Sequence, residues 1–324
     1  MTFGIGIKSY SGVVAPRTVN GVSVWYAPSW TQVYVAGQGM VWVNTPLLSV
    51  TDLLLNPDFE GTYVSGVAPS WAKTGTPTPS ESSDFYSGAK SQELTASSSF
   101  SNSVSQVTTA PANLWYRYSA YVKRVSGTGT GRITWSAGAV MTTTSDSYAQ
   151  LSACWRPASA NPTFYCYGSA VGDVLRFDFA SLKQIITASL FATRFYGSGV
   201  SAYSVPALII AGHQGGLVSW LDNPANPQNY LQAWINLATG KIQLDKVVGG
   251  TLTAGIVPAT TITYVAWKVV EIKRTGVNTF QLWYDGVQIG SDATVSDAEI
   301  IGNSYFGLFS TDPVVQIGQP TATY

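Results

Sequence analysis

The sequence predicts an all-β protein in which a small N-terminal β-meander precedes two antiparallel β-sandwiches. Short runs in which apolar and polar residues alternate recur along the chain, and this period of two is that of a half-buried strand. Gly, Pro, Asn and Asp separate the runs, as they do at turns between strands. A length of 324 residues corresponds to about two domains with additional segments.

The low content of charged residues and the absence of net charge limit the kinds of partner that the protein is expected to bind. Charged residues make up 10% of the chain, so the surface is expected to consist of Ser, Thr, Gly, Asn and Gln. Lys plus Arg and Asp plus Glu both number 17, so no net charge attracts nucleic acid or an anionic membrane. No run of about 18 apolar residues is present, so we expect no membrane insertion.

Residues 1–50 form the first predicted unit. Its short strands carry alternating valines at Val22, Val24, Val33, Val35, Val41 and Val43. Strands of this length would be marginally stable alone, so we expect the segment to dock by adding strands to a partner or a symmetry mate. The alternative is an ordinary hairpin packed on the next domain. The pattern looks like small N-terminal segments of bacteriophage tail and virion proteins.

Residues 51–187 form the second predicted unit, and its marks lie in a recognisable order. They are Asn-Pro-Asp-Phe-Glu-Gly from Asn56, then Trp71, Tyr-Ser-Gly-Ala-Lys-Ser from Tyr86, the strand Trp115–Lys123, and Leu-Arg-Phe-Asp-Phe-Ala-Ser-Leu from Leu175. This order resembles the carbohydrate-binding modules of the family 4/9 type, with Asp58 in place of the family's Gly and Phe179 in place of its second closing Asp. The resemblance implies a jelly-roll sandwich of two antiparallel sheets.

The resemblance also implies a structural calcium ion. Modules of this type often hold Ca²⁺ between the segment after Asn56 and the closing strand, and Ca²⁺ prefers six to eight oxygen ligands. By position, Glu60 and Asp178 would be the side-chain ligands, with Asp58 as a third. The alternative is that Glu60 and Asp178 cap loops by hydrogen bonds.

Residues 188–324 form the third predicted unit. Val270 and Ile272 alternate with Glu271 and Lys273, and the strand that contains Phe280, Leu282 and Tyr284 leads into a predicted two-residue turn at Asp285-Gly286. This order resembles the laminin-G/concanavalin-like jelly-roll sandwiches. Trp267 has the opposite phase to Val270, so either a bulge intervenes or Trp267 faces the other side of the sheet.

Flat aromatic side chains are the candidates for sugar binding, because a pyranose ring stacks its C–H face on them. On the strand that begins at Tyr116, alternate residues form the core side, and Arg117 and Tyr121 point outward. We add Trp71 in a loop of the same unit, Trp135, and Trp283, which is out of phase with its core-facing neighbours. For each residue the alternative is edge packing or a subunit contact.

Catalytic groups are sparse, so we predict that the protein is not an enzyme. His213 is the only histidine, in a Gly-rich loop, and no Gly-x-Ser-x-Gly motif is present. Glycoside hydrolysis requires two carboxylates, and the nearest match, Asp297-Ala298-Glu299, lies in a polar link. Cys154 and Cys166 flank a turn and would lie opposite one another if their strands pair, either as reduced thiols or as a cross-strand disulfide.

Taken together, these features predict a non-enzymatic virion structural protein of a tailed phage, such as a tail fibre, spike or capsid decoration. It would be assembled in the host cytoplasm, act extracellularly in host adhesion, bind other virion proteins through its N-terminal segment and possess lectin-like sandwiches for a cell-surface glycan. The resemblance to fibres implies a homo-oligomer, with a trimer favoured. The alternative is a carbohydrate-binding module array of a secreted bacterial protein or adhesin.

Overall fold

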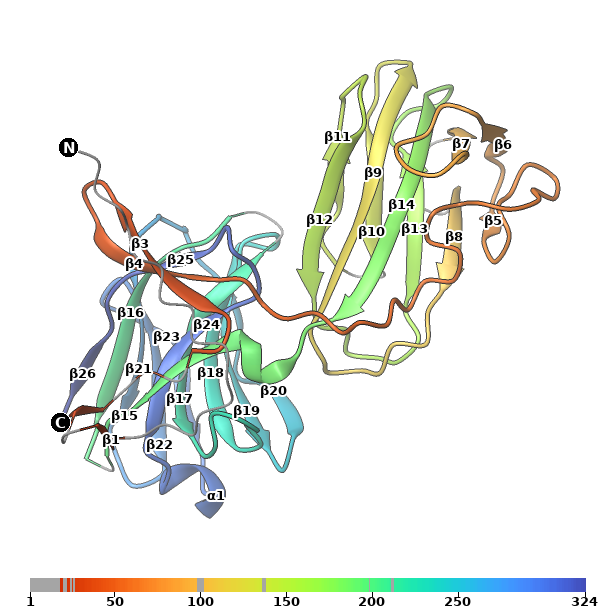
Figure 1. Cartoon of the computed structure of the whole chain (residues 1–324). Helices are drawn as coiled ribbons and strands as arrows, with labels where there is room; N and C mark the ends of the chain where they lie inside the picture. The colour runs from red at the N-terminus through yellow and green to blue at the C-terminus, as the bar shows by residue number, and fades with distance from the viewer. Residues whose placement is uncertain are drawn as a thin grey trace. The chain divides into compact units, whose positions relative to one another are not determined.

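A computed structural model describes residues 18–19, 22–23, 25, 27–97, 102–135, 138–197, 199–210 and 213–324. The chain divides into a middle unit, Leu48–Ile185, and a C-terminal unit that comprises Ile186–Tyr324 together with the N-terminal residues up to Leu47 (Figure 1). Both units are built from antiparallel strands, which confirms the predicted all-β class. Within the described ranges, no helix is long and apolar enough to cross a membrane.

The middle unit is a sandwich of two five-stranded sheets. The first, here called the β9 sheet, has the order β12-β9-β14-β7-β6, and the second, the β13 sheet, has the order β11-β10-β13-β8-β5. The β9 sheet comprises β12 (Ala149–Trp155), β9 (Tyr116–Ser126), β14 (Val174–Gln184), β7 (Ser91–Thr95) and β6 (Thr78–Ser82). The β13 sheet comprises β11 (Met141–Thr143), β10 (Gly131–Trp135), β13 (Thr163–Gly168), β8 (Ser103–Val107) and β5 (Ala72–Thr74).

Alternation along β9 divides core from surface as predicted. Tyr116, Tyr118, Ala120 and Val122 are fully buried in the core between the two sheets. The intervening side chains, including Arg117 and Tyr121, are only half-buried because they project from the opposite side of the β9 sheet.

The segment from Asn56 to Gly61, the first motif of the predicted jelly-roll sandwich, is a loop and not a strand. Asn56 and Phe59 have φ angles of 50° and 55°, in the left-handed region that strands do not use. The loop nevertheless lies against the closing strand as expected, because Ala180 N donates to Pro57 O at 2.7 Å. The first and last motifs of the predicted module, the loop after Asn56 and the closing strand, therefore lie next to one another.

The predicted opposition of the two cysteines is wrong. Cys154 lies on β12 in the β9 sheet, whereas Cys166 lies on β13 in the β13 sheet, so the turn between them connects the two sheets rather than two paired strands. Both are buried and neither is in a disulfide, which agrees with the reduced alternative.

The C-terminal unit contains a six-stranded sheet and an eight-stranded sheet, and the two enclose one core. The six-stranded sheet has the order β15 (Phe191–Phe195), β24 (Tyr305–Ser310), β17 (Gln214–Leu221), β18 (Tyr230–Asn236), β19 (Lys241–Val248) and β20 (Thr251–Thr261). The other has the order β23 (Val287–Thr294), β22 (Thr279–Tyr284), β21 (Val269–Arg274), β16 (Ala202–Leu208), β25 (Gln316–Ile317), β4 (Gly39–Asn44) and β3 (Trp30–Val35), with β26 (Thr321–Thr323) also paired to β16. The remaining elements are the β1–β2 ladder (Thr18–Val19 with Val22–Ser23), the 3₁₀ helix η1 (Thr187–Leu190) and the helix α1 (Ala298–Ile301).

The predicted alternation of this unit is also confirmed. Val270, Ile272, Phe280 and Leu282 are fully buried. Asp285 and Gly286 both have positive φ and join β22 to β23 as a two-residue turn. Trp267, with φ 67°, precedes β21 and stands outside the strand, so it takes no part in the alternation of β21.

The N-terminal strands do not form the separate unit predicted for residues 1–50. β3 and β4 form a hairpin, and β4 pairs with β25 at the C-terminal end of the chain. Asn44 secures the hairpin, since its Nδ2 donates to Ser189 O at 2.9 Å and to Ser310 O at 2.7 Å. The hairpin therefore belongs to the C-terminal unit. Val24 and residues 1–17 of the predicted segment lie outside the described residues.

Candidate functional site

Four aromatic rings gather on the outward side of the β9 sheet. Tyr121 projects from β9, Tyr148 lies just before β12, Phe179 lies on β14, and Tyr86 comes from the loop before β7. The rings of Tyr86 and Tyr121 are stacked, with centroids 3.5 Å apart. The Tyr86 ring centroid lies 6.1 Å from that of Tyr148 and 6.4 Å from that of Phe179. We call these four residues the aromatic cluster.

Two of the cluster's rings are exposed, although aromatic rings of this size are usually covered in a monomer. The exposed fraction is 47% for Tyr86 and 49% for Phe179. Exposed aromatic groups that lie next to one another are a feature of binding surfaces. The cluster therefore presents flat apolar area to solvent at one place on the unit.

Asp178 positions Tyr86 from beneath. The Asp178 side chain is fully buried, and its Oδ2 accepts from the main-chain N–H groups of Tyr86 at 2.7 Å and Ser87 at 2.9 Å. Its Oδ1 accepts from Phe179 N at 2.7 Å. Burial is the largest influence on the Asp178 carboxyl and raises its pKa, while these three N–H groups oppose the shift.

Glu60 secures the other end of the same loop. Its Oε1 accepts from Ala89 N at 2.6 Å and from Lys90 N at 3.0 Å. Gly88 lies between the two carboxylates with φ 81°, and a Cβ there would come within 2.2 Å of Glu60 Oε1. Only glycine combines this backbone angle with this approach. The loop that carries Tyr86 is thus held by two carboxylates and one obligatory glycine.

Phe179 is held in a strained conformation. Its φ is 45°, which is uncommon for a residue other than glycine, and it sits where the β14–β9 register shifts between Asp178 and Ser181. The shift turns the Phe179 ring outward beside Tyr86 and Tyr121. Strain of this kind persists where the surroundings enforce it, and it concentrates at functional sites.

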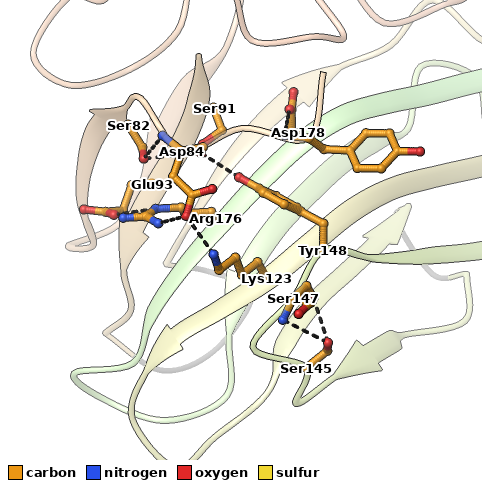
Figure 2. Close-up of polar contacts among 11 residues, drawn as sticks. Ser82, Asp84, Ser91, Glu93, Lys123, Ser145, Ser147, Tyr148, Arg176 and Asp178 are labelled. Carbon is orange, nitrogen blue, oxygen red and sulfur yellow. Dashed lines mark hydrogen bonds and ion pairs between the residues drawn. The ribbon is translucent and has the colours of Figure 1, made fainter. Parts of the chain in front are cut away.

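A polar network borders the cluster, and Figure 2 shows Asp84 at its centre. The Asp84 carboxylate binds Lys123 Nζ at 2.7 Å and also Arg176, whose Nε binds Glu93 Oε2 at 2.9 Å. The Tyr148 hydroxyl donates to Asp84 O at 2.8 Å. The hydrogen bond from Lys123 is the main reason why the pKa of Asp84 lies below its ordinary value. The two acids and two bases of this border neutralise one another.

The hydroxyls of Tyr148 and Tyr121 remain protonated at neutral pH. Burial raises the pKa of Tyr148 to about 12, and a hydrogen bond with Tyr86 raises the pKa of Tyr121. Each hydroxyl can therefore both donate and accept a hydrogen bond. The site offers flat apolar rings together with neutral and paired polar groups.

Two of the five residues predicted to bind carbohydrate lie in the core instead. Trp135 is fully buried among Tyr116 and Tyr118. Trp71 is 7% exposed, stacks on Phe59 and donates its Nε1–H to Asn56 O at 2.9 Å. Neither ring has a free face for a sugar, because the loop after Asn56 folds over one and the two sheets enclose the other.

The other three predicted residues lie on outward faces, but not together. Tyr121 is a member of the aromatic cluster, and Arg117 lies on the same side of β9 four residues away. Trp283 lies on the outer side of β22 in the C-terminal unit. Lys273 Nζ lies 3.8 Å from its ring centroid, and its Nε1 donates to Gln281 Oε1 at 3.1 Å.

The oxygens predicted to bind calcium have other partners. Both oxygens of Asp178 and Oε1 of Glu60 accept main-chain N–H groups. These are the hydrogen bonds that the loop-capping alternative predicts. Asp58 is half-buried in the loop that contains Glu60.

The remaining residues considered for catalysis, His213 and Asp297, lie beside charged side chains. His213 Nδ1 lies 3.6 Å from Asp312 Oδ2, a partner that sequence spacing did not indicate. Asp297 immediately precedes α1, so the Asp297–Glu299 segment lies outside any strand, as predicted. The Asp297 carboxylate binds Lys246 Nζ at 2.8 Å.

Comparison with known proteins gives structural likeness only. No family model and no curated protein matches the chain. The xylan-binding CBM22-1 domain of Xyn10C from Paenibacillus barcinonensis is similar over 41% of this chain and 95% of its own, at 18% identity and a TM-score of 0.35. The CBM22-1–CBM22-2 tandem of the same Xyn10C covers 86% of this chain and 100% of its own, at 13% identity and a TM-score of 0.35. The CBM66 module from Bacillus subtilis covers 40% of this chain and 77% of its own, at 16% identity and a TM-score of 0.30.

Proposed function

We propose that the middle unit binds a neutral carbohydrate on the aromatic cluster. The observation that carries the proposal is the exposed pair Tyr86 and Phe179, held beside Tyr121 by the buried Asp178 carboxylate and a strained backbone. A sugar ring presents a C–H face to such rings and hydroxyls to the polar groups that border them. Because the bordering charges already pair with one another, the site favours a ligand without net charge.

Binding without turnover is part of the same proposal. A glycosidase needs a carboxylic acid that holds a proton near neutral pH. Asp84, in the polar network that borders the rings, has its pKa lowered by Lys123 and carries no proton to donate there. Asp178 is committed to three main-chain N–H groups. These roles support adhesion rather than hydrolysis.

The test is a calorimetric titration of the full chain with a panel of neutral oligosaccharides. We expect Tyr86→Ala and Phe179→Ala each to weaken the best ligand at least about tenfold, which is about 1.4 kcal/mol. Val107→Ala is the matched control, since Val107 is 67% exposed on the opposite sheet of the same unit. The proposal fails if no neutral glycan binds, or if both aromatic variants bind as the control does.

The biological setting proposed for this activity is a phage virion, where the protein would act as a structural component in host adhesion. The same face would serve equally in a carbohydrate-binding array of a secreted bacterial protein. Mass spectrometry of purified virions separates the two settings. Detection of the chain supports the virion role, and its absence from particles together with retained glycan binding supports the secreted array.

A further inference from the structure

β3 is an edge strand without the usual protection. It pairs with β4 on one side and, among the residues that the structure describes, with no strand on the other. Its side chains from Thr31 to Tyr34 are exposed. The strand contains no charged residue, no proline and no register shift, which are the devices that natural proteins use to block edge-to-edge pairing.

The free main-chain groups of β3 can be identified from its pairing. Thr45 N donates to Ser29 O at 2.8 Å, and these two residues continue the β3–β4 register. Because hydrogen-bonded and non-hydrogen-bonded pairs alternate in an antiparallel ladder, Thr31 and Val33 direct their main-chain groups toward β4. Gln32 and Tyr34 therefore direct their N–H and C=O groups toward the open side.

We propose that the open edge of β3 pairs with β3 of a second copy of this chain, antiparallel and across a two-fold axis at Gln32. In this register Gln32 lies opposite Gln32 of the partner subunit, and the N–H of Tyr34 meets the C=O of Trp30 in the second copy. The N–H of Trp30 already donates to Ala27 O at 3.4 Å within its own chain. Val33 then lies opposite Thr31. Both outward main-chain groups of Gln32 and the outward N–H of Tyr34 find partners.

The strand's composition favours a second copy over another occupant. A two-fold axis places each side chain near its own duplicate, so a charged edge would repel itself, whereas this edge carries no charge. The exposed cross-strand neighbours Thr31 and Val33 form two β-branched pairs, which are favourable combinations. Tyr34, 72% exposed, and Met40, 44% exposed beside it in the β3–β4 register, would become covered.

Sedimentation equilibrium of the full chain tests the pairing, because one strand pair forms a small, reversible interface. We expect wild type to form a concentration-dependent dimer. Gln32→Lys and Gln32→Glu should each be monomeric where wild type is dimeric, since like charges then face one another at the axis. An equimolar mixture of the two variants should dimerise, because Lys then faces Glu.

Gln38→Lys is the matched control. Gln38 is exposed in the turn of the same hairpin, away from the edge, so this variant should dimerise like wild type. Circular dichroism of every variant verifies folding. A monomeric wild type, a trimer, or dimerisation of Gln32→Lys equal to that of wild type would overturn the proposal.

Discussion

Tyr86 in the middle unit and Trp283 in the C-terminal unit are both aromatic side chains on the outer side of a sandwich, yet their surroundings differ. Tyr86 belongs to a loop that two carboxylates hold in place, and its ring is 47% exposed beside three others. Trp283 projects from β22, and Lys273 covers its ring. An outward aromatic side chain thus becomes a candidate platform only where neighbouring elements keep its face clear.

Removal of the Asp178 acceptor should have the largest effect on the loop that carries Tyr86 and therefore on the aromatic cluster. Asp178→Asn replaces one oxygen with an amide that cannot accept the N–H groups it meets. We expect the free energy of unfolding of the middle unit to fall by about 2 kcal/mol, and glycan binding to be lost. Urea denaturation and calorimetric titration measure the two effects.

Asp285→Asn provides the control for that variant. Asp285 is exposed in a turn with positive φ, which asparagine also adopts, so stability and binding should remain unchanged. If Asp178→Asn were as stable as this control, Asp178 would not be what holds the loop.

Phe179→Gly should separate stability from binding. Glycine relieves the positive φ of 45°, so we expect the free energy of unfolding to rise by about 1 kcal/mol. Loss of the ring should weaken glycan binding about tenfold. Phe179→Asn, which tolerates the same φ, should repeat the loss of binding. Loss of stability in Phe179→Gly would show that the ring contributes more to packing than the backbone strain costs.

Trp283→Ala should leave glycan binding unchanged. Its expected cost is at most about 1 kcal/mol of stability, from the lost contact with Lys273. The same titration used for Tyr86→Ala measures binding. If Trp283→Ala bound the glycan tenfold more weakly, the binding site would lie in the C-terminal unit instead.

Acid should loosen the border of the aromatic cluster only slightly. The Lys123 hydrogen bond lowers the pKa of Asp84 from its ordinary 3.8, so the stabilising contribution of Asp84 is complete above pH 3.8 and disappears as the pH falls through the lower folded value. The side chain is 41% exposed, so the effect is small. The melting temperature of Asp84→Asn should therefore fall less steeply below pH 3.8 than that of wild type.

Calcium should have the smallest effect of all. Since Asp178 and Glu60 accept main-chain N–H groups, neither added Ca²⁺ nor a chelator should change the melting temperature of the full chain. Glu60→Gln serves as the comparison and should lower it by loosening the loop. A rise in melting temperature with Ca²⁺ that Glu60→Gln abolishes would restore the metal site predicted from the sequence.

Local alternation was sufficient to predict the strands and their faces. Tyr118 and Val122 are buried, Tyr121 is not, and Asp285-Gly286 forms the predicted turn, because each depends only on neighbours in sequence. The pairing of β4 with β25 was beyond such reasoning, since the partners lie at opposite ends of the chain. Sheet assignment failed for Cys154 and Cys166 because a short turn can connect two sheets as well as two paired strands.

The candidate site was only partly predictable. Tyr121 followed from its phase on β9, but Trp71 and Trp135 were chosen by residue type, and residue type does not report burial. Tyr86 and Phe179 were missed because a loop anchor and a register shift bring them together. One sequence signal was available: Phe179 stands where the carbohydrate-binding modules that the sequence resembles have an acid, so an apolar residue there needed an explanation.

The most direct test of the central claim is a titration of the full chain with a neutral oligosaccharide, followed by nuclear magnetic resonance of isotope-labelled aromatic rings. We expect the ring signals of Tyr86, Tyr121 and Phe179 to shift together as ligand is added, while those of Trp283 stay in place. Shifts confined to Trp283, or the absence of shifts in the aromatic cluster when the ligand is bound, would contradict it.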